Sequence, residues 1–305
     1  MAIVQTNINY TYEEMTKNIS ELRYIYPFLQ VEIIGYSVLG RSIPVIKLGN
    51  GPNNVFYSGS FHANEWITSV LLMKFIEDFS FAYSNNITLF GYSVRNIFEY
   101  SSIYIVPMVN PDGVDLVTGY YSPISSIYNS FKNISGNYPE IPFPEGWKAN
   151  FNGVDLNLQF PSSWEQARQI KFSQGYSSPA PRDFVGFGPL TEPESLAIYN
   201  FTLSHNFRLV IAYHTQGEEI YWQFQNYNPP DSYYIGNIFS TVSGYKLTEV
   251  PYNSSFAGYK DWFIQDYNRP GYTIEAGLGE NPLPISEFDK IYNDNIGTLV
   301  LGSVL

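Results

Sequence analysis

The segment Asn54-Val55-Phe56-Tyr57-Ser58-Gly59 is an apolar run, and the tetrad His62-Ala63-Asn64-Glu65 follows it after two residues. The run predicts a short buried strand over 55–58, and apolar positions at helical spacing predict a helix over 65–81. A buried strand followed by a helix is typical of an α/β domain. In such domains ligands bind outside the carboxyl ends of the strands, which is where this tetrad lies.

The rest of the chain continues the alternation of strands and helices. Buried strands are predicted at 103–106, 207–213 and 271–274, a β-hairpin at 31–36 and 42–48, and helices at about 12–26, 192–205, 233–242 and 286–304. The stretch from about 119 to 178 is rich in Ser, Asn, Pro and Gly, and we predict that it forms functional loops. The pattern indicates a mixed, mainly parallel twisted sheet with helices on both faces. With no internal repeat and no linker, one domain over 1–305 is expected.

Composition narrows the function classes. The 305 residues carry a net charge of −12 without any Lys/Arg cluster, so binding to nucleic acid through its phosphates is not expected. The absence of cysteine rules out disulfides, thiolate metal sites and cysteine nucleophiles. Residues 1–12 show no secretory signal, and no apolar stretch is long enough to span a membrane. A cytoplasmic location, or release without a visible signal peptide, is therefore expected.

Two of the three histidines stand where a zinc hydrolase would need them. His62 and Glu65 can share one metal at the start of a helix, because side chains three residues apart point the same way. His214 and Glu275 each follow a predicted strand, so all four groups are expected at one edge of the sheet. Each also has an ordinary reading: a capping or surface role for His62 and Glu65, a core histidine for His214, and a hydrogen-bonded strand-end carboxylate for Glu275. His205 follows a helix and is assigned no chemistry.

Five segments together resemble the zinc carboxypeptidase family typified by carboxypeptidase A, in the family's order and at comparable spacings. The segments are Phe61-His62-Ala63-Asn64-Glu65-Trp66-Ile67-Thr68, Val109-Asn110-Pro111-Asp112-Gly113-Val114, Gly153-Val154-Asp155-Leu156-Asn157, Tyr213-His214-Thr215 and Tyr272-Thr273-Ile274-Glu275. The resemblance implies one Zn²⁺ per chain held by His62, Glu65 and His214, with Glu275 as the general base and acid. Lys148 falls where the family usually has an arginine that polarises the scissile carbonyl, although a solvated surface lysine is the ordinary reading. Asp112 and Asp155 are expected to orient loops or zinc ligands rather than to react.

The departures from the family concern the substrate's terminal carboxylate. Asn64 and the pair Asn157-Leu158 stand where carboxypeptidases usually have the arginines and asparagine that bind this group. Leucine cannot hold a carboxylate, so removal of an ordinary C-terminal residue is not the expected reaction. The surroundings of these residues instead resemble a bacterial branch of the family, the γ-D-glutamyl-diamino acid endopeptidases of peptidoglycan stem peptides. A bacterial origin is implied, and the N-terminal wall-binding repeats that are frequent in this branch are not seen.

Three further residues are candidates for contacts with the substrate. Glu218 could face the ammonium group of the diamino acid, or it could belong to an exposed acidic turn. Tyr252 and Tyr259 are both candidates for the mobile tyrosine that the family places over the substrate.

The sequence therefore predicts a zinc metallopeptidase that hydrolyses the γ-D-glutamyl–diamino acid amide bond of peptidoglycan peptides. Two alternatives remain open. One is a metallocarboxypeptidase that uses an arginine from another loop, such as Arg168, Arg182 or Arg269. The other is a catalytically silent protein that binds zinc or the cell wall.

Overall fold

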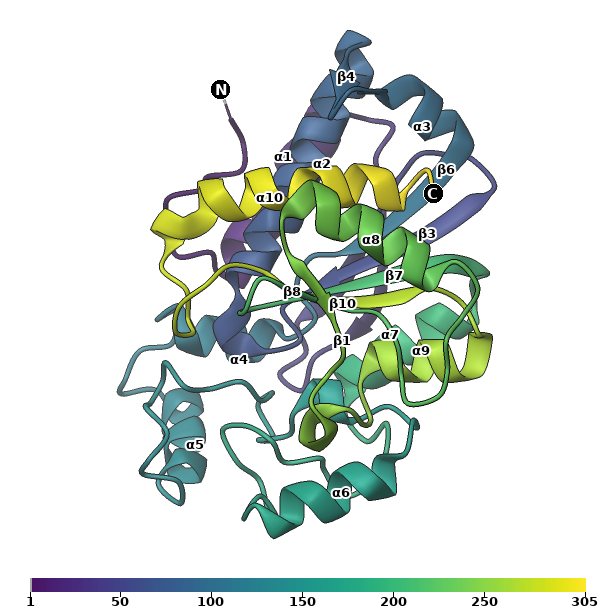
Figure 1. Cartoon of the computed structure of the whole chain (residues 1–305). Coiled ribbons are helices and arrows are strands. Elements are labelled where there is room, and N and C mark those ends of the chain that lie inside the picture. The colour runs from purple at the N-terminus through teal and green to yellow at the C-terminus, as the bar shows by residue number, and fades with distance from the viewer. Residues whose placement is uncertain (1) are drawn as a thin grey trace.

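The structure is a computed structural model that describes residues 2–305, and an eight-stranded sheet runs through it (Figure 1). Its strands are β1 (Gln30–Tyr36), β2 (Ser42–Leu48), β3 (Asn53–Gly59), β6 (Ser101–Val106), β7 (Phe207–His214), β8 (Glu219–Tyr221), β9 (Lys246–Thr248) and β10 (Gly271–Glu275). A separate small hairpin consists of β4 (Thr88–Leu89) and β5 (Tyr92–Ser93).

The strand order is β1-β2-β6-β3-β7-β10-β8-β9. The central strands β6, β3, β7 and β10 are parallel to one another, whereas β2 is antiparallel to both β1 and β6. On the other side β8 runs antiparallel to β10 and parallel to β9. The predicted mixed, mainly parallel sheet is therefore confirmed, and the four parallel strands direct their carboxyl ends to the same edge.

Helices cover both faces of the sheet (Figure 1). One face packs against α1 (Tyr12–Ile25), α2 (Ile67–Asn85), α3 (Val94–Tyr100), α8 (Ser232–Ser243) and α10 (Phe288–Gly302). The opposite face packs against α7 (Pro193–Leu203) and α9 (Tyr259–Tyr267). Three further helices lie among the loops near the carboxyl edge: α4 (Pro111–Val117), α5 (Ser126–Ser135) and α6 (Trp164–Ser173).

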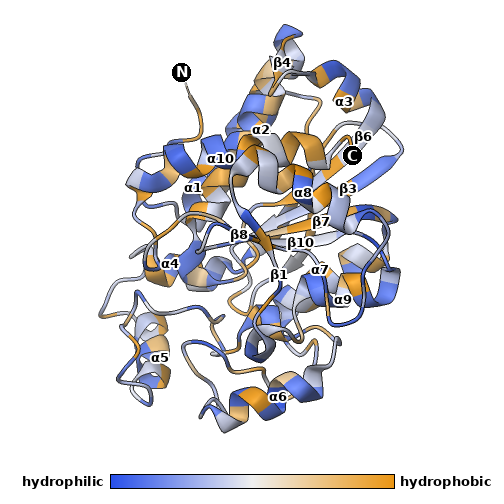
Figure 2. Ribbon diagram, viewed as in Figure 1, coloured by the Kyte–Doolittle hydropathy of each residue, from blue (hydrophilic) through white to orange (hydrophobic). Residues whose placement is uncertain are grey.

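Strand β3 shows why the sheet is buried on both faces. Its consecutive side chains alternate between two cores: Val55 and Tyr57 join the α2 side, and Phe56 joins the side of α7 and α9. All three side chains are fully buried. Burial on both faces explains why the middle of a central parallel strand has consecutive apolar residues, and the hydropathy colouring shows hydrophobic stretches within the sheet (Figure 2).

The long elements agree with the sequence predictions to within a few residues, but three expectations need correction. Glu65 lies in a short 3₁₀ turn (Ala63–Glu65), and α2 begins only at Ile67. The stretch 119–178 is not purely loop, since it contains α5 and α6. Helices α3, α4 and α9 and the short strands β4, β5, β8 and β9 were not predicted at all.

Within residues 2–305, none of the helices is both long and apolar enough to cross a membrane.

Candidate active site

The candidate site lies at the carboxyl ends of β3, β7 and β10. His214 is the last residue of β7 and Glu275 is the last residue of β10, and the two are direct partners in the parallel register. His62 and Glu65 follow β3 in the turn that leads into α2. Parallel pairing of adjacent strands thus brings together residues that are up to 213 positions apart in the chain, from 62 to 275.

Three side chains converge tightly enough to hold a metal ion. The Nδ1 atoms of His62 and His214 lie 3.2 Å apart, and each lies 2.9 Å from an oxygen of the Glu65 carboxylate. Two imidazole nitrogens and one carboxylate oxygen are the donor set of many catalytic zinc sites, in which water or substrate takes the fourth position. Among residues 2–305 this is the group whose donor types and mutual distances fit a metal ion.

Neighbouring side chains hold the two histidines through their other ring nitrogens. His62 Nε2 lies 3.0 Å from Asp155 Oδ1, and His214 Nε2 lies 3.4 Å from Asn157 Nδ2. A carboxylate on the outer nitrogen fixes the tautomer and the ring orientation of a metal-binding histidine. The structure therefore places Asp155 in the orienting position expected from the sequence. Asp112 holds a loop instead of a zinc ligand, because it accepts a hydrogen bond from the Leu39 backbone N–H.

The electrostatics of the triad reflect dense packing of opposite charges. Burial alone lowers the pKa of His62, but Glu65 and Asp155 outweigh it and raise the pKa to about 9. Burial likewise disfavours the charge on Glu65, yet His62, Lys148 and His214 hold its pKa well below the usual range. Glu65 is therefore an anionic carboxylate at neutral pH, as a metal ligand must be.

Lys148 lies beside the triad, with its Nζ atom 2.9 Å from Glu65 Oε1. Asn110 holds the loop that carries it, because the Asn110 amide donates to the carbonyl oxygens of Phe61 and Ala149. The backbone N–H of Ala63 also donates to the Lys148 carbonyl at 3.0 Å. These bonds tie the loop of Lys148 directly to the loop of His62.

Glu275 is a buried carboxylate next to this group. Burial, reinforced by the negative charge of Glu65, raises its pKa to about 8, although Lys148 and His62 act in the opposite direction. A group whose pKa lies near neutrality can both accept and return a proton. The arrangement thus combines a candidate metal site, a cation and a proton carrier within one cleft.

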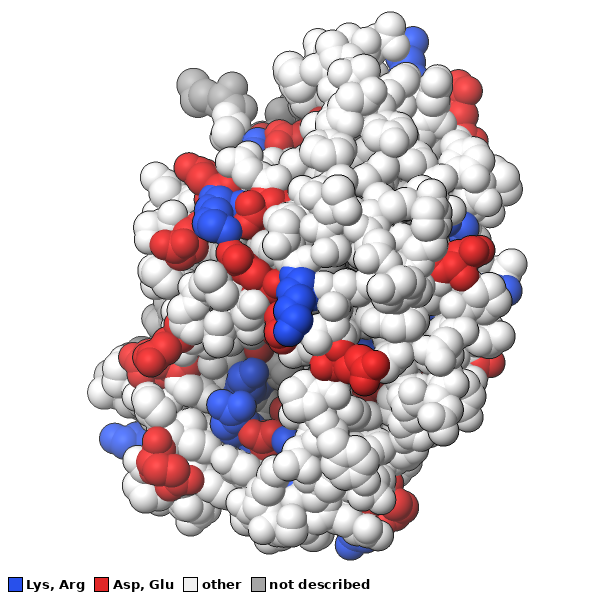
Figure 3. All heavy atoms as spheres, in the orientation of Figure 1, with Lys and Arg blue, Asp and Glu red and all other residues white. Residues whose placement is uncertain are grey.

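The cleft opens on the surface between α5 and α6, where Figure 3 shows a hollow with basic and acidic side chains on its walls. Asn157 and Leu158 line it, as expected, together with Lys148, Glu275 and the two histidines of the triad. Leu158 contributes an apolar side chain to the wall. Of the three alternative arginines, only Arg182 lines this cleft. Arg168 contacts Glu165 on α6, and Arg269 donates to the backbone at the opposite end of β7.

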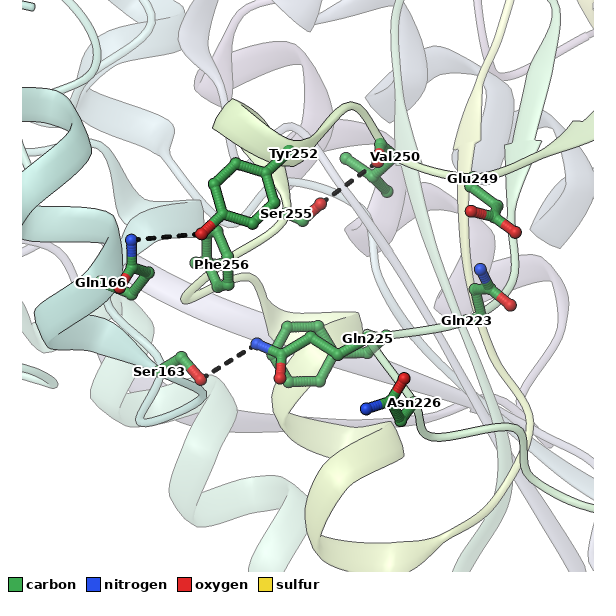
Figure 4. Close-up of a pocket in the computed structure, with 11 residues that line it drawn as sticks. Ser163, Gln166, Gln223, Gln225, Asn226, Glu249, Val250, Tyr252, Ser255 and Phe256 are labelled. Carbon is green, nitrogen blue, oxygen red and sulfur yellow. Dashed lines mark hydrogen bonds between the residues drawn. The ribbon is translucent and has the colours of Figure 1, made fainter.

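The two tyrosine candidates lie in different surroundings. Tyr259 is fully buried, donates or accepts a hydrogen bond with Thr202, and stacks on Phe61, so it belongs to the core and does not line the cleft. Tyr252 is 65% exposed on the segment that follows β9. Its ring lies over Phe256 and its hydroxyl points toward Gln166 in a neighbouring pocket (Figure 4). Tyr252 is thus adjacent to the cleft and remains the better candidate for a movable tyrosine.

Glu218 does not line the cleft. It pairs with Lys290 of α10 at 2.5 Å, which matches the reading of this residue as part of an acidic turn. Its neighbour Glu219 lies closer to the site, where it accepts a hydrogen bond from the Tyr221 hydroxyl.

Sequence reasoning missed several residues of the cleft wall. These are Tyr221, Lys171, Asp183, Lys260 and Asp261. Tyr221 and Thr273 face each other across β8 and β10, so Tyr221 could have been found only by predicting the three-residue strand β8. The others come from α6, α9 and the 181–183 loop, in or beside elements that the sequence did not reveal.

The fold and the His-Glu-His group define a metal-dependent hydrolase of the α/β class. The sequence profile of the family described as zinc carboxypeptidase matches residues 15–298, and the chain belongs to this family. It is therefore a zinc-dependent peptidase, and His62, Glu65 and His214 are the residues that could hold the ion.

Individual relatives support membership of the zinc carboxypeptidase family. The chain is 46% identical over 303 residues to gamma-D-glutamyl-L-diamino acid endopeptidase 1 of Lysinibacillus sphaericus, covering 99% of this chain and 74% of the relative. It is 40% identical to the uncharacterised protein YqgT of Bacillus subtilis strain 168, covering 93% and 74%. The solved structure of carboxypeptidase A from Helicoverpa armigera shares the fold, with a TM-score of 0.70 at 18% identity, covering 100% and 74%.

Proposed function

We propose that this chain hydrolyses the amide bond between γ-D-glutamate and the diamino acid of peptidoglycan stem peptides. The observation that carries the proposal is the 46% identity, over nearly the whole chain, to a gamma-D-glutamyl-L-diamino acid endopeptidase. The cleft is compatible with such a substrate, since both cationic and anionic side chains line it and a diamino acid carries groups of both charges. We further propose that residues 1–305 act as one catalytic unit, with the substrate as partner.

In the proposed reaction, His62, Glu65 and His214 would hold zinc, and the ion would supply an acidified water molecule and a charge that polarises the scissile carbonyl. Glu275 accepts the proton of the attacking water and then delivers it to the leaving amine. Its raised pKa suits both steps, because the group titrates near neutral pH. Lys148 donates to the carbonyl oxygen as negative charge develops on it, as a single ammonium rather than as arginine's two-nitrogen fork.

The positioning of the reacting groups depends on their neighbours. Asp155 keeps the His62 ring in one orientation, and Asn157 lies against His214. Leu158 adds an apolar surface to the cleft wall that also carries these groups.

The proposal is tested by digestion of defined peptides, read by mass spectrometry with and without a chelator. L-Ala-γ-D-Glu-diaminopimelate, with and without D-Ala, is compared with ordinary α-linked peptides that have free or amidated C-termini. Release of L-Ala-γ-D-Glu that stops with chelator is the expected result. Loss of single C-terminal residues from the α-linked free acids would instead identify a carboxypeptidase, a mode that Arg182 in the cleft makes chemically possible.

Glu275→Gln tests the role of this carboxylate in the proposed reaction. The amide is nearly isosteric but cannot accept the proton, so turnover should fall by at least about 100-fold while one zinc per chain is retained. Zinc content by atomic absorption and cleavage rate are measured on the same sample. An unchanged rate would remove Glu275 from the mechanism.

A further inference from the structure

We propose that Arg182 binds a free carboxylate of the diamino acid in the catalytic cleft. The inference rests on the proposed function, and it supplies the carboxylate partner that Leu158 and Asn64 do not provide. Arg182 lines the same cleft as Lys148 and Glu275 but comes from a different loop.

Only one of the three guanidinium nitrogens of Arg182 makes a hydrogen bond within residues 2–305. Its Nε donates to Asp183 Oδ2 at 2.7 Å, and within residues 2–305 neither Nη atom makes a hydrogen bond. The side chain is 41% exposed. Two terminal N–H groups in a fixed plane are the arrangement that pairs bidentately with a carboxylate.

The position of Arg182 is fixed relative to the metal triad. Asp183 accepts from both Arg182 and Lys171, and its own backbone N–H donates to Asp155 Oδ2 at 3.3 Å. The other oxygen of Asp155 lies 3.0 Å from His62. A single carboxylate, Asp155, therefore holds both the metal-ligand ring and the loop of Arg182, so a group bound by Arg182 would lie in a defined register with the scissile bond.

The ion pairs of the cleft distinguish Arg182 from the other cations that line it. Lys148 is paired with Glu65, and Lys260 is paired with Asp261 and with the carbonyl oxygen of Gln223. Lys171 and Arg182 share the single carboxylate of Asp183, which leaves one positive charge in this trio uncompensated. Lys171 is buried against Asp183, so the exposed guanidinium is the part of the trio that can reach an anion.

Three peptides separate the two carboxylates that could bind. L-Ala-γ-D-Glu-meso-diaminopimelate carries both free groups, the L-lysine analogue lacks the side-chain carboxylate, and extension by D-Ala converts the main-chain carboxylate into an amide. Wild type is expected to cleave the peptides that keep the recognised carboxylate more efficiently than the one that lacks it. Weaker cleavage of the lysine peptide would assign recognition to the side-chain carboxylate, and weaker cleavage of the D-Ala peptide would assign it to the main-chain carboxylate.

Substitution of Arg182 should remove this preference. Arg182→Gln is expected to raise KM roughly 10- to 100-fold for the preferred peptides with kcat little changed, since a charged hydrogen-bonded pair is lost. Arg182→Lys keeps the positive charge but not the two-nitrogen fork, so its KM should lie between those of wild type and Arg182→Gln. Arg168→Gln makes the same change on α6 outside the cleft and should leave both constants unaltered. The inference is wrong if Arg182→Gln keeps the wild-type preference, or lowers kcat equally on all peptides.

Calorimetric binding gives a readout that does not depend on turnover. In the Glu275→Gln background, the peptides that keep the recognised carboxylate should bind more tightly than the peptide that lacks it. Adding Arg182→Gln should make the affinities equal. A wild type that leaves the γ-glutamyl bond intact would end the proposed function, yet calorimetry would still decide on Arg182. Equal affinities for all three peptides with Arg182 present would overturn the inference.

Discussion

At the scale of single residues, Lys148 is the cation nearest the metal triad. In the proposed reaction Lys148 stabilises charge that develops on the carbonyl oxygen only in the transition state, so Lys148→Met should lower kcat by roughly 100- to 1,000-fold with a smaller effect on KM. Steady-state kinetics on the stem tripeptide measure this. Lys148→Arg is the matched control and should retain much of the rate, since the family's usual residue at this place is arginine. A Met variant with normal kcat and full zinc content would exclude the role.

Glu194 is a buried carboxyl whose titration affects folding rather than catalysis. Burial raises its pKa to about 7, against the hydrogen bonds it accepts from the Val38 backbone N–H and from Asn150. Because the folded-state pKa is raised, Glu194 contributes its full stabilisation of the folded state below the pKa of the unfolded chain, near 4.5. This contribution is lost as the pH rises through 7.

Glu194→Gln should remove this dependence because the amide does not ionise. Relative to wild type, the variant is expected to gain up to about 3 kcal/mol of unfolding free energy between pH 4.5 and pH 8. Urea unfolding at several pH values, in the presence of chelator, measures the difference. Parallel stability curves for the two proteins would show that Glu194 keeps an ordinary pKa.

At the scale of elements, α4 joins the loops that carry the site. A Cβ added at Gly113 would lie 2.7 Å from the Ala149 carbonyl oxygen and 2.7 Å from the Ala63 Cβ. These two residues follow Lys148 and His62 directly, so the clash would push the cation and the metal ligand apart. The helix needs glycine here for close approach, although alanine has the higher helix propensity.

Gly113→Ala is therefore expected to lower stability by about 1–3 kcal/mol and to lower kcat as well. Gly136→Ala at the end of α5 is the matched control, because its Cβ would meet only ordinary contacts at 3.5 Å and beyond. Thermal unfolding and kinetics of both variants test this. Equal behaviour of the two would mean that α4 adjusts without disturbing the site.

Elements differ in how far sequence pattern alone reveals them. Helices such as α1 and α10 were predicted because caps or periodic apolar positions mark them over three turns or more. Helix α9 was missed because Trp262, Phe263 and Ile264 are consecutive apolar residues, all buried, which obscures the helical period. Strands β8 and β9 have three residues each, and they exist through pairing with β10 and with each other.

At the scale of the whole molecule, metal binding should contribute to stability. The triad draws its residues from segments after β3 and at the end of β7, so an ion bound by all three would bind the folded chain in preference to the unfolded one. Zinc at about 100 times its dissociation constant would add about 2.7 kcal/mol, which raises Tm by a few degrees in a chain of this size.

Differential scanning calorimetry of the chelated protein, with and without added zinc, measures the shift. Glu275→Gln should keep it, whereas His214→Ala should abolish it because one ligand is removed. A zinc-induced shift that survives in His214→Ala would place the stabilising ion elsewhere.

The sequence by itself determined the α/β class and the central strands, because apolar runs become buried strands. The residues of the metal triad were expected from the resemblance to the zinc carboxypeptidases, and their places just beyond the strand ends agreed with it. Only the tertiary structure decided the wall of the cleft. It separated Tyr252 from the buried Tyr259, paired Glu218 with Lys290, and brought Arg182 beside Lys148. Such contacts join loops and short elements distant in the chain, and their geometry depends on packing that no local pattern records.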